Sequence, residues 1–398
     1  MARRIALIAD TFPPFRTSGA VQLRDLSRQF AQEGIDITVI LPAAGLDRPW
    51  SLEHRENVQV LRLRAPRTKD LNYAHRTLAE MCMPFAMIKN LRQSPLAETR
   101  WDGVIWYSPS IFLGPVANVL KKASNCNSYL IVRDIFPEWA VDMGLMGRGA
   151  LYWFFKAVAQ YQYLVADTIG VQSPGNLEFF KKWKDRGFGR LEVLQNWLAD
   201  APVCGCSINL TGTTLSDRKI FVYAGNMGVA QGMDILLELA DSFRGRQDIG
   251  FVFVGRGSDA SRLVTNARTR GLQNVLFFDE IEPQQIPGLL AQCQAGIVAL
   301  DPRHKTHNIP GKFLTYMQSG LPVLATVNNG NDLVKLIRTE DVGRACTDNS
   351  VATLHGLAED LLLQLERDLE MRGRCKQLFG RLFSPAAATN QILAALKM

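Results

Sequence analysis

The chain has 398 residues, a formal net charge of +7, and a composition that is 47% hydrophobic and 21% charged. A chain of this length exceeds what a single hydrophobic core usually supports, which predicts two domains. The composition is that of a globular protein and contains no low-complexity tract. There is no uncharged apolar run of eighteen or more residues and no signal-peptide pattern, so we expect a cytoplasmic protein without a spanning helix.

The cysteines indicate neither a disulfide framework nor a zinc site. They are odd in number, scattered, and never form a Cys-x-x-Cys pair, which predicts reduced thiols. Cys204 and Cys206 lie close together, but without further ligands nearby this spacing is attributed to chance. The seven positions are Cys82, Cys126, Cys204, Cys206, Cys293, Cys346 and Cys375.

Positive charge is concentrated in the first half of the chain. Residues 1–200 carry 25 basic side chains against 19 acidic ones, and residues 201–398 carry 20 against 19. The excess is modest and no nucleic-acid-binding motif accompanies it, so no nucleic acid partner is expected. Residues 55–92 interleave eight basic residues with apolar ones, which suits an element lying on the anionic inner face of a membrane. The alternative is an amphipathic helix packed on its own domain with its charges solvated.

Short apolar runs alternate with helical patterns along residues 1–200. A helix with Leu23, Leu26 and Phe30 at spacings of three and four follows the first run, and Gly34 ends it. Such alternation predicts a parallel sheet with helices on both faces. Strands are expected at residues 5–9, 37–41, 58–63, 103–107, 129–132, 168–172 and 191–194.

A second series of strands follows residues 201–218, which are small, polar and irregular and predict a linker. The predicted domains are therefore residues 1–200 and 219–380, with a C-terminal segment, 381–398, placed to pack back on the first domain. We expect an α/β protein of two Rossmann-like domains facing across a cleft, with ligands beyond the carboxyl ends of the strands. The second strands are expected at residues 220–224, 251–254, 275–278, 295–300 and 322–325, and a last helix at 386–398.

The loop of residues 10–19, DTFPPFRTSG, follows the first strand. It lacks the Gly-x-Gly-x-x-Gly fingerprint, which argues against a nicotinamide or flavin enzyme. Gly19 would let the backbone approach a ligand at the start of the helix, although a purely structural turn is the alternative.

The segment of residues 301–325, DPRHKTHNIPGKFLTYMQSGLPVLA, carries the clearest indication of a site. Pro310 is expected in the first turn of a helix, and Gly320 after its end. Phe313 and Met317 are four residues apart and are expected in the core. The helix therefore has a second face available for a ligand.

Lys312 and Thr315 share that second face, and His307 and Asn308 lie just before the helix. A helix N-terminus carries partial positive charge and free N–H groups, so an added lysine builds an anion site suited to a diphosphate. Taken alone, Lys312 is equally compatible with a solvated lysine.

Two weaker candidate loops accompany this site. Residues 223–232, YAGNMGVAQG, place Gly225 and Gly228 at a strand end, where the backbone can approach a phosphate, and the turn at Gly255 is similar. In the first half, Asp134 and Glu138 follow the strand at 129–132 and are candidate acid/base or acceptor-binding groups. Asp134 equally fits a capped turn.

Together these segments resemble glycosyltransferase family 4, whose members have two facing Rossmann-like domains (the GT-B arrangement) and retain anomeric configuration. The resemblance includes Ser173-Pro174 and Gln195-Asn196-Trp197. More narrowly, DGVIWYSPSIFLGP, RDIFPEW and HKTHNIPGKFLTYMQSGLPVLA resemble bacterial O-antigen N-acetyl-L-fucosaminyltransferases. That resemblance implies a UDP-sugar donor and a polyprenyl-diphosphate-linked saccharide acceptor in lipopolysaccharide biosynthesis.

The chain departs from the family pattern at its charged positions. Asn226 and Gln231 stand where many members have the arginine and lysine that grip the donor diphosphate, and His307 and Thr315 stand where many have two glutamates. Lys312 is our candidate to replace the lost charge. Alternatives are a non-hydrolysing UDP-sugar epimerase and a non-catalytic partner in a polysaccharide assembly complex.

The predicted site therefore needs neither a cofactor nor a metal, since no Asp-x-Asp motif occurs. Asp134, Glu138 and Lys312 are the predicted catalytic groups. The predicted donor-binding residues are Gly19, Gly225, Asn226, Gly228, Gln231, Gly255, His307, Asn308, Lys312 and Thr315.

Overall fold

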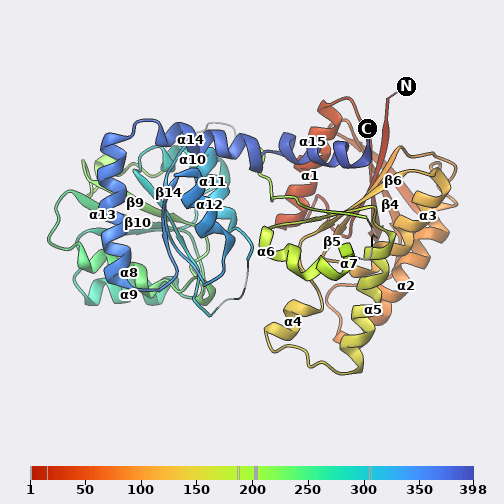
Figure 1. Ribbon diagram of the computed structural model, residues 1–398, viewed down its shortest axis with the longest axis horizontal. Helices are drawn as coiled ribbons and strands as arrows, with labels where there is room; N and C mark the ends of the chain where they lie inside the picture. Colours follow the sequence, from red (N-terminus) through yellow and green to blue (C-terminus); the bar gives the residue numbers. More distant parts are fainter. Residues whose placement is uncertain are drawn as a thin grey trace. The chain divides into compact units, whose positions relative to one another are not determined.

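The computed structural model describes residues 2–15, 17–185, 187, 189–200, 205–303, 305 and 307–398. Several positions considered above lie outside these residues: Arg16 of the first loop, Cys204 with the start of the expected linker, and His304 and Thr306. The described chain forms two compact units (Figure 1), Met1–Gln195 with Pro385–Met398, and Asn196–Ser384. Both are α/β units, which confirms the predicted fold class.

The first unit is built on an eight-stranded sheet in the order β3-β4-β2-β1-β5-β6-β7-β8. Its strands pair in parallel except for β3, which runs antiparallel to β4 at the edge. β3 was not predicted, because its sequence WSLEHR is short and has only two apolar residues, Trp50 and Leu52. The strands are β1 Arg4–Ile8, β2 Asp36–Ala43, β3 Trp50–Arg55, β4 Val58–Arg64, β5 Gly103–Ser108, β6 Asn127–Val132, β7 Thr168–Val171 and β8 Arg190–Val193.

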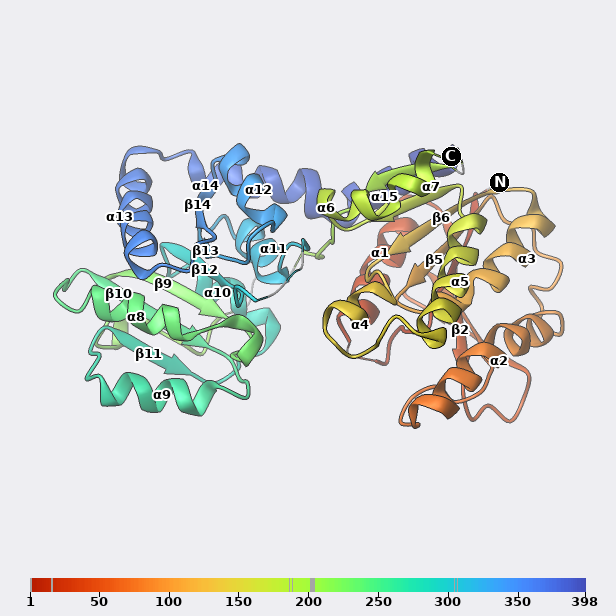
Figure 2. The same ribbon diagram turned by 60° about the horizontal axis from the view of Figure 1, so that its bottom comes forward.

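Helices cover both faces of this sheet (Figures 1 and 2). α1 and α15 pack side by side on one face, and α2, α3 and α5 pack in a row on the other. Shorter helices follow β6 and β7. The helices are α1 Ser18–Gln32, α2 Tyr73–Leu91, α3 Gly114–Ser124, α4 Glu138–Asp142, α5 Ala150–Val165, α6 Pro174–Leu177, η2 Glu178–Phe180, α7 Lys181–Asp185 and α15 Pro385–Leu396.

The second unit contains a parallel six-stranded sheet in the order β11-β10-β9-β12-β13-β14. β14 was not predicted, because GRAC is short and only weakly apolar. The strands are β9 Lys219–Ala224, β10 Ile249–Val254, β11 Val275–Phe278, β12 Ala295–Ala299, β13 Val323–Thr326 and β14 Gly343–Cys346. The helices are α8 Asp234–Ser242, α9 Ala260–Thr269, α10 Ile286–Leu290, α11 Gly311–Gln318, α12 Asp332–Glu340, α13 Val351–Arg367 and α14 Met371–Leu378.

In each sheet the first strand of the unit lies in the middle and later strands lie on both sides of it. β1 pairs with β2 and β5, and β9 pairs with β10 and β12. Chain connections diverge at such a point, which opens a crevice beyond the strand ends where ligands of doubly wound sheets bind. The topology therefore marks one candidate position in each unit.

The boundary between the units differs from the expected linker at 201–218. The described part of that segment packs on the second unit: Ile208, Leu210 and Leu215 are buried in its core. Gln292 holds the segment by accepting from the Leu210 N–H at 2.9 Å and donating to the Ile208 carbonyl at 2.9 Å. The composition of this segment suggested a linker because most of its residues are polar. Its few apolar residues are nevertheless enough to pack it on the second unit.

The C-terminal helix α15 belongs to the first unit. The side chain of Asn127, at the start of β6, donates to the Leu396 carbonyl at 3.0 Å. Gln391 donates to the Val193 carbonyl and to the Glu192 carboxylate, both at 2.8 Å. These bonds tie the last helix to two strands of the first sheet.

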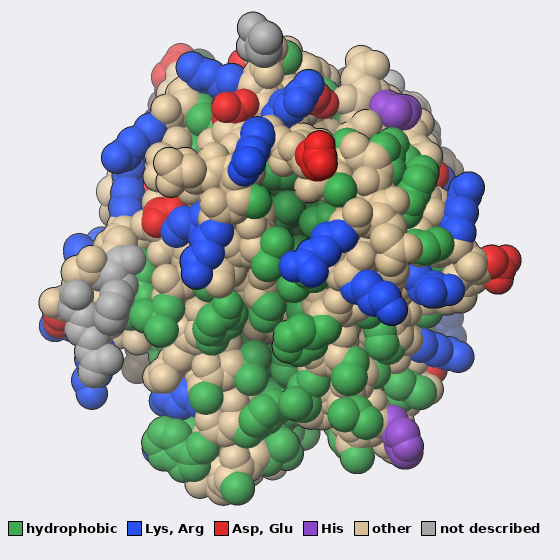
Figure 3. All heavy atoms as spheres, turned by 90° about the vertical axis from the view of Figure 1, so that its right-hand side faces the viewer, with side chains coloured by type: hydrophobic (Ala, Val, Ile, Leu, Met, Phe, Trp, Pro, Cys, Tyr) green, Lys and Arg blue, Asp and Glu red, His purple; other side chains and the backbone are tan. Residues whose placement is uncertain are grey.

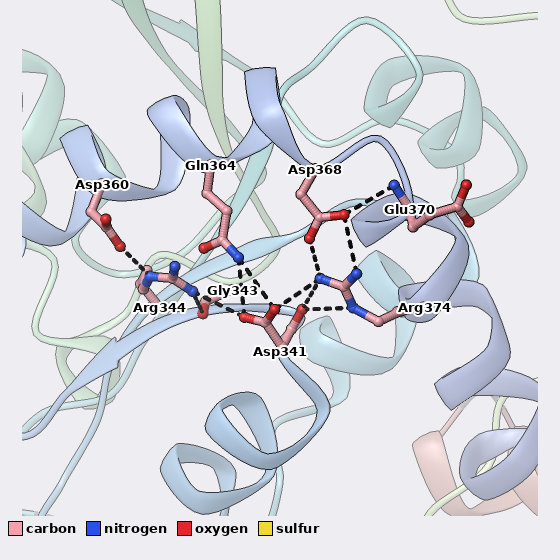
Figure 4. Close-up of polar contacts among 8 residues, drawn as sticks. All are labelled: Asp341, Gly343, Arg344, Asp360, Gln364, Asp368, Glu370 and Arg374. Carbon is pink, nitrogen blue, oxygen red and sulfur yellow. Dashed lines mark hydrogen bonds and ion pairs between the residues drawn. The ribbon is translucent and has the colours of Figure 1, made fainter.

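A polar network joins four elements of the second unit (Figure 4). Asp341 follows α12 with a φ of 47° and accepts from Arg344, Gln364 and Arg374. Arg374 also donates to Asp368, which places one guanidinium between two carboxylates. The network connects α12, β14, α13 and α14.

Candidate functional site

A cavity of about 510 Å³ opens at the carboxyl end of β9 in the second unit. Its walls come from the ends of β9 and β10, the loop after β11, and α11. This is the switch point of the sheet, and the volume falls in the range typical of small-molecule sites. Residues at the strand ends and on α11 include Ala224, Gly225, Asn226, Gly255, Arg256, Glu280, Lys312 and Thr315.

Lys312 lines this cavity together with another cation, Arg256. Lys312 lies in the first turn of α11, and its Nζ is 4.7 Å from the centre of the Tyr223 ring. Burial lowers the pKa of Lys312 to about 8. No ion pair or hydrogen bond from its ammonium group occurs within the described residues. A desolvated cation without a carboxylate, next to a helix N-terminus, is suited to bind an anion.

Two glycines let the strand ends approach the lysine. Gly225 has a φ of 141°, and a Cβ on it would lie 3.0 Å from Cε of Lys312. Gly255 has a φ of 144°, and a Cβ on it would lie 2.0 Å from the Gly225 carbonyl oxygen. A side chain at Gly255 would therefore collide with backbone, one at Gly225 would crowd the lysine, and either would strain the backbone.

The crevice itself is maintained by Tyr316 on α11. β9 and β12 pair only over Ala295–Phe221 and Gly296–Val222 and then separate. The buried Tyr316 hydroxyl lies between them: it accepts from the Ala224 N–H at 3.2 Å and is 3.2 Å from the Ile297 carbonyl oxygen. The tyrosine thus satisfies backbone groups that the diverging strands leave unpaired.

The Gly225 loop is braced by its own side chains. The Gln231 side-chain oxygen accepts from the Asn226 amide at 3.0 Å and from the Gly228 N–H at 3.1 Å. Asn226 lines the cavity, whereas Gly228 and Gln231 do not. The structure therefore shows Gln231 positioning this loop, and its direct contact with the donor stays a prediction.

The predicted residues around α11 separate into two groups. Lys312 and Thr315 line the cavity, as their shared helix face predicts. His307 and Asn308 do not line it: His307 Nδ1 is 2.7 Å from the Gly330 carbonyl oxygen, and Asn331 contacts the Asn308 carbonyl. Pro310 caps α11 with extended backbone rather than lying in its first turn, since the helix begins at Gly311.

In the first unit, a polar group gathers at the switch point between β1 and β5. Arg133 donates to the Tyr107 hydroxyl at 3.1 Å and to the Ser18 hydroxyl at 3.3 Å. Oδ1 of Asp10, directly after β1, is buried without a hydrogen-bond partner among the described residues, and burial raises its pKa. Desolvation likewise raises the pKa of Asp134. Raised carboxyl pKa values at strand ends mark candidate acid/base groups.

Glu138 lies apart from that group. Its carboxylate forms an ion pair with Lys156 on α5 at 3.1 Å and accepts from the Tyr152 hydroxyl at 3.2 Å. Its role as an acid/base or acceptor-binding group stays a prediction. Gly19 lies at the start of α1, against Tyr107, and its donor-binding role remains a prediction.

Known proteins resemble the chain in sequence. Residues 218–363 match the family "Glycosyl transferases group 1". WcaI of Escherichia coli, named as a colanic acid biosynthesis glycosyl transferase, is 26% identical over 282 residues, which are 67% of this chain and 69% of WcaI. WbjE of Pseudomonas aeruginosa, named as a glycosyltransferase, is 22% identical over 85% of this chain and 83% of WbjE.

The structure resembles solved glycosyltransferases throughout its length. Sucrose-phosphate synthase from Thermosynechococcus elongatus matches with a TM-score of 0.68 at 15% identity, over 99% of this chain and 98% of the other. HepE from Anabaena, solved in complex with UDP, matches with a TM-score of 0.66 at 14% identity, over 99% of both chains. At such identities the likeness shows the fold, which is GT-B. Together the comparisons indicate a glycosyltransferase with the GT-B fold, whose residues 218–363 match group 1.

Sequence reasoning missed two charged groups of this glycosyltransferase. Arg256 lines the cavity and forms an ion pair with Glu280 at 2.9 Å, although its turn looked like an ordinary Gly-x-Gly. Asp10 was taken only as the start of a loop. A charged residue directly after a buried strand is the signal that could have identified both, because strand ends converge on the ligand crevice.

Proposed function

We propose that this glycosyltransferase moves a sugar from a UDP-sugar to a polyprenyl-diphosphate-linked saccharide during assembly of a surface polysaccharide. One observation carries the proposal: Lys312, desolvated and without a carboxylate partner in the described chain, faces a cavity at the β9 switch point. The N-terminus of α11 adds its partial positive charge to the same place. An anionic ligand of nucleotide size accounts for both features.

The chemistry follows from where charge develops. When the glycosidic bond to the donor breaks, negative charge grows on the leaving diphosphate, and preorganised positive groups lower the barrier. In this proposal Lys312 and the α11 N–H groups meet that charge without a divalent ion or other cofactor. Retention of anomeric configuration and N-acetyl-L-fucosamine as the sugar are finer proposals, supported by the resemblance alone.

The relatives support the class of substrate. HepE was solved with UDP, WcaI is named for colanic acid biosynthesis, and the structurally similar WaaG is described as involved in lipopolysaccharide biosynthesis. In the first unit, Asp134 and Asp10 are the groups we propose for the acceptor hydroxyl, since both have raised pKa values. Glu138 also stays a predicted group for this role, although it is paired with Lys156.

The surface of the first unit supports contact with the inner membrane. Among the residues that the structure describes, 14 of the 17 exposed large hydrophobic side chains belong to it, including Tyr73, Leu78 and Phe85 of α2 and Trp153 of α5. Figure 3 shows hydrophobic side chains gathered over this face beside a band of lysines and arginines. Apolar and basic groups together suit an anionic lipid surface. In the described chain, no helix has both the length and the apolar character needed to span a bilayer.

Calorimetric titration with UDP, GDP and ADP tests the donor assignment. We expect UDP to bind more tightly than the other two. Preference for GDP or ADP would contradict the UDP-sugar proposal while keeping the transferase fold. No binding by any nucleotide would favour the non-catalytic assembly partner, and conversion of a UDP-sugar without acceptor would favour the epimerase.

A further inference from the structure

A second cavity, of about 320 Å³, lies in the first unit beside α5, and we call it the α5 groove. Its walls are mainly apolar. α5 contributes Ala159, Tyr163 and Leu164, η2 contributes Phe179 and Phe180, and α7 contributes Trp183. The groove is distinct from the polar group at the β1–β5 switch point.

The walls are held in place by contacts of their own. The rings of Tyr163 and Phe180 meet edge to face with centroids 4.9 Å apart, and Trp183 Nε1 donates to the Tyr163 carbonyl at 3.2 Å. Leu164 and Phe179 remain 54% and 39% exposed at the rim. When an apolar chain covers this prebuilt groove and its exposed apolar rims, apolar surface is removed from water, and this makes binding favourable.

The charge at the groove is basic, because within the described residues only one of its lysines is paired with a carboxylate. Lys156, in the groove, is neutralised by Glu138 at 3.1 Å. On α7, Lys181, Lys182 and Lys184 lie within one turn, and no ion pair involves them in the part of the chain that the structure describes. Lys182 lines the groove itself. The α5 groove therefore combines apolar walls with Lys182, which has two further lysines beside it on the same short helix.

We propose that the α5 groove binds the isoprenoid chain of a phosphorylated lipid, whose phosphate lies against the α7 lysines. This rests on the proposed function, in which such a lipid carries the acceptor saccharide. Apolar walls match the chain and the α7 lysines match the phosphate. The proposed function supplies an isoprenoid lipid as the carrier of the acceptor saccharide, and this favours it over a membrane phospholipid. Glu138 then serves to neutralise Lys156 inside the groove.

Farnesyl diphosphate, a short and soluble isoprenoid, is the probe. It is titrated into the full-length protein in excess UDP, so that the diphosphate site of the second unit is occupied, and again into Lys312→Met, where that site is removed. Gln160→Trp fills the groove from the exposed face of α5. Ala157→Trp adds the same side chain at an exposed α5 position outside the groove.

We expect farnesyl diphosphate to bind with the same affinity in excess UDP and in Lys312→Met. Gln160→Trp should weaken binding at least tenfold and Ala157→Trp less than twofold, while Lys182→Gln should weaken it about threefold and reduce its dependence on salt. Unchanged affinity in Gln160→Trp, or equally tight binding of inorganic pyrophosphate, would overturn the proposal. Equal competition by phosphatidylglycerol would assign the groove to membrane phospholipid instead.

The two proposals fail separately. UDP titration of Gln160→Trp reports on the second unit alone, and we expect it to match the unmodified protein. Loss of UDP binding with farnesyl diphosphate binding intact would contradict the proposed function and leave the groove as a lipid site. The reverse result would remove the groove and leave the donor site.

Discussion

The ammonium group of Lys312 is incompletely solvated, and it lies over the ring of Tyr223. Burial of an unpaired charge destabilises the folded state, and the lowered pKa of about 8 expresses that cost. Strongly perturbed groups of this kind concentrate at functional sites. In the proposed function, the negative charge of the donor diphosphate offsets this cost.

The lowered pKa of Lys312 predicts how UDP affinity depends on pH. Above about pH 8 the free protein loses the proton, so binding a diphosphate must also recover it, whereas UDP itself is fully ionised there. We expect UDP to bind about tenfold more weakly at pH 9 than at pH 7. Calorimetry at pH 7, 8 and 9 measures this.

The same shift affects stability in the opposite direction. Between about pH 8 and the ordinary lysine value the unfolded chain binds more protons than the folded one, so this residue's contribution to stability rises with pH. A pH-independent UDP affinity would contradict the role of Lys312. In Lys312→Met, the loss of UDP affinity above pH 8 should disappear.

At the scale of single residues, local spacing was a good guide and long-range pairing was not. Lys312 and Thr315 share a helix face, so the spacing of three residues predicted that both reach the cavity. Glu138 was predicted to be reactive because it follows a strand, but Lys156, eighteen positions later, neutralises it. That pairing depends on how α4 and α5 pack, which no local pattern encodes.

At the scale of elements, buried parallel strands were predictable because their apolar runs are continuous. β3 and β14 lie at sheet edges, bury less apolar surface and carry weaker patterns, so both were missed. The strand order that creates the opening between β9 and β12 was predictable. The position of the Tyr316 hydroxyl in that opening was not predictable.

The Asp341 network gives a prediction at this scale. Asp341 accepts from Gln364 at 3.2 Å and from Arg374 at 3.0 Å, and its backbone is left-handed with a φ of 47°. Asp341→Ala loses these bonds and adds backbone strain, so we expect the free energy of unfolding to fall by about 1–2 kcal/mol. Urea unfolding measures the change.

Asp341→Gly is the matched control for that experiment. It loses the same hydrogen bonds but tolerates the left-handed backbone, so it should destabilise less than Asp341→Ala. If both variants unfold like the unmodified protein, the network in Figure 4 does not stabilise the second unit. UDP affinity should be unchanged in both, because Asp341 does not line the cavity.

At the scale of the whole molecule, exposed apolar side chains are distributed unequally between the two units. Leu363 and Leu369 are exposed in the second unit, but most others, including Leu78 and Phe85 at 60% and 68%, belong to the first. The sequence predicted the α2 part of this surface from its basic and apolar composition. The contribution of α5 was not predicted, because this helix carries a single charged residue, Lys156.

This asymmetry predicts which changes release the protein from membranes. Leu78→Ser with Phe85→Ser removes two exposed apolar groups of α2, and we expect binding to vesicles rich in phosphatidylglycerol to weaken at least tenfold. Co-sedimentation measures the bound fraction. Leu363→Ser with Leu369→Ser is the matched control and should bind normally. Equal binding by both double variants would contradict a membrane surface on α2.

The measurement that tests the central claim most directly is calorimetric titration of UDP into Lys312→Met beside the unmodified protein. Lys335→Met, at an exposed position on α12, is the control. A charge-assisted contact to a diphosphate is worth roughly 1.5–3 kcal/mol, so we expect affinity to fall about tenfold or more in Lys312→Met and to stay unchanged in Lys335→Met. A folded Lys312→Met protein that binds UDP as tightly as the unmodified protein would contradict the claim that this lysine holds the donor diphosphate.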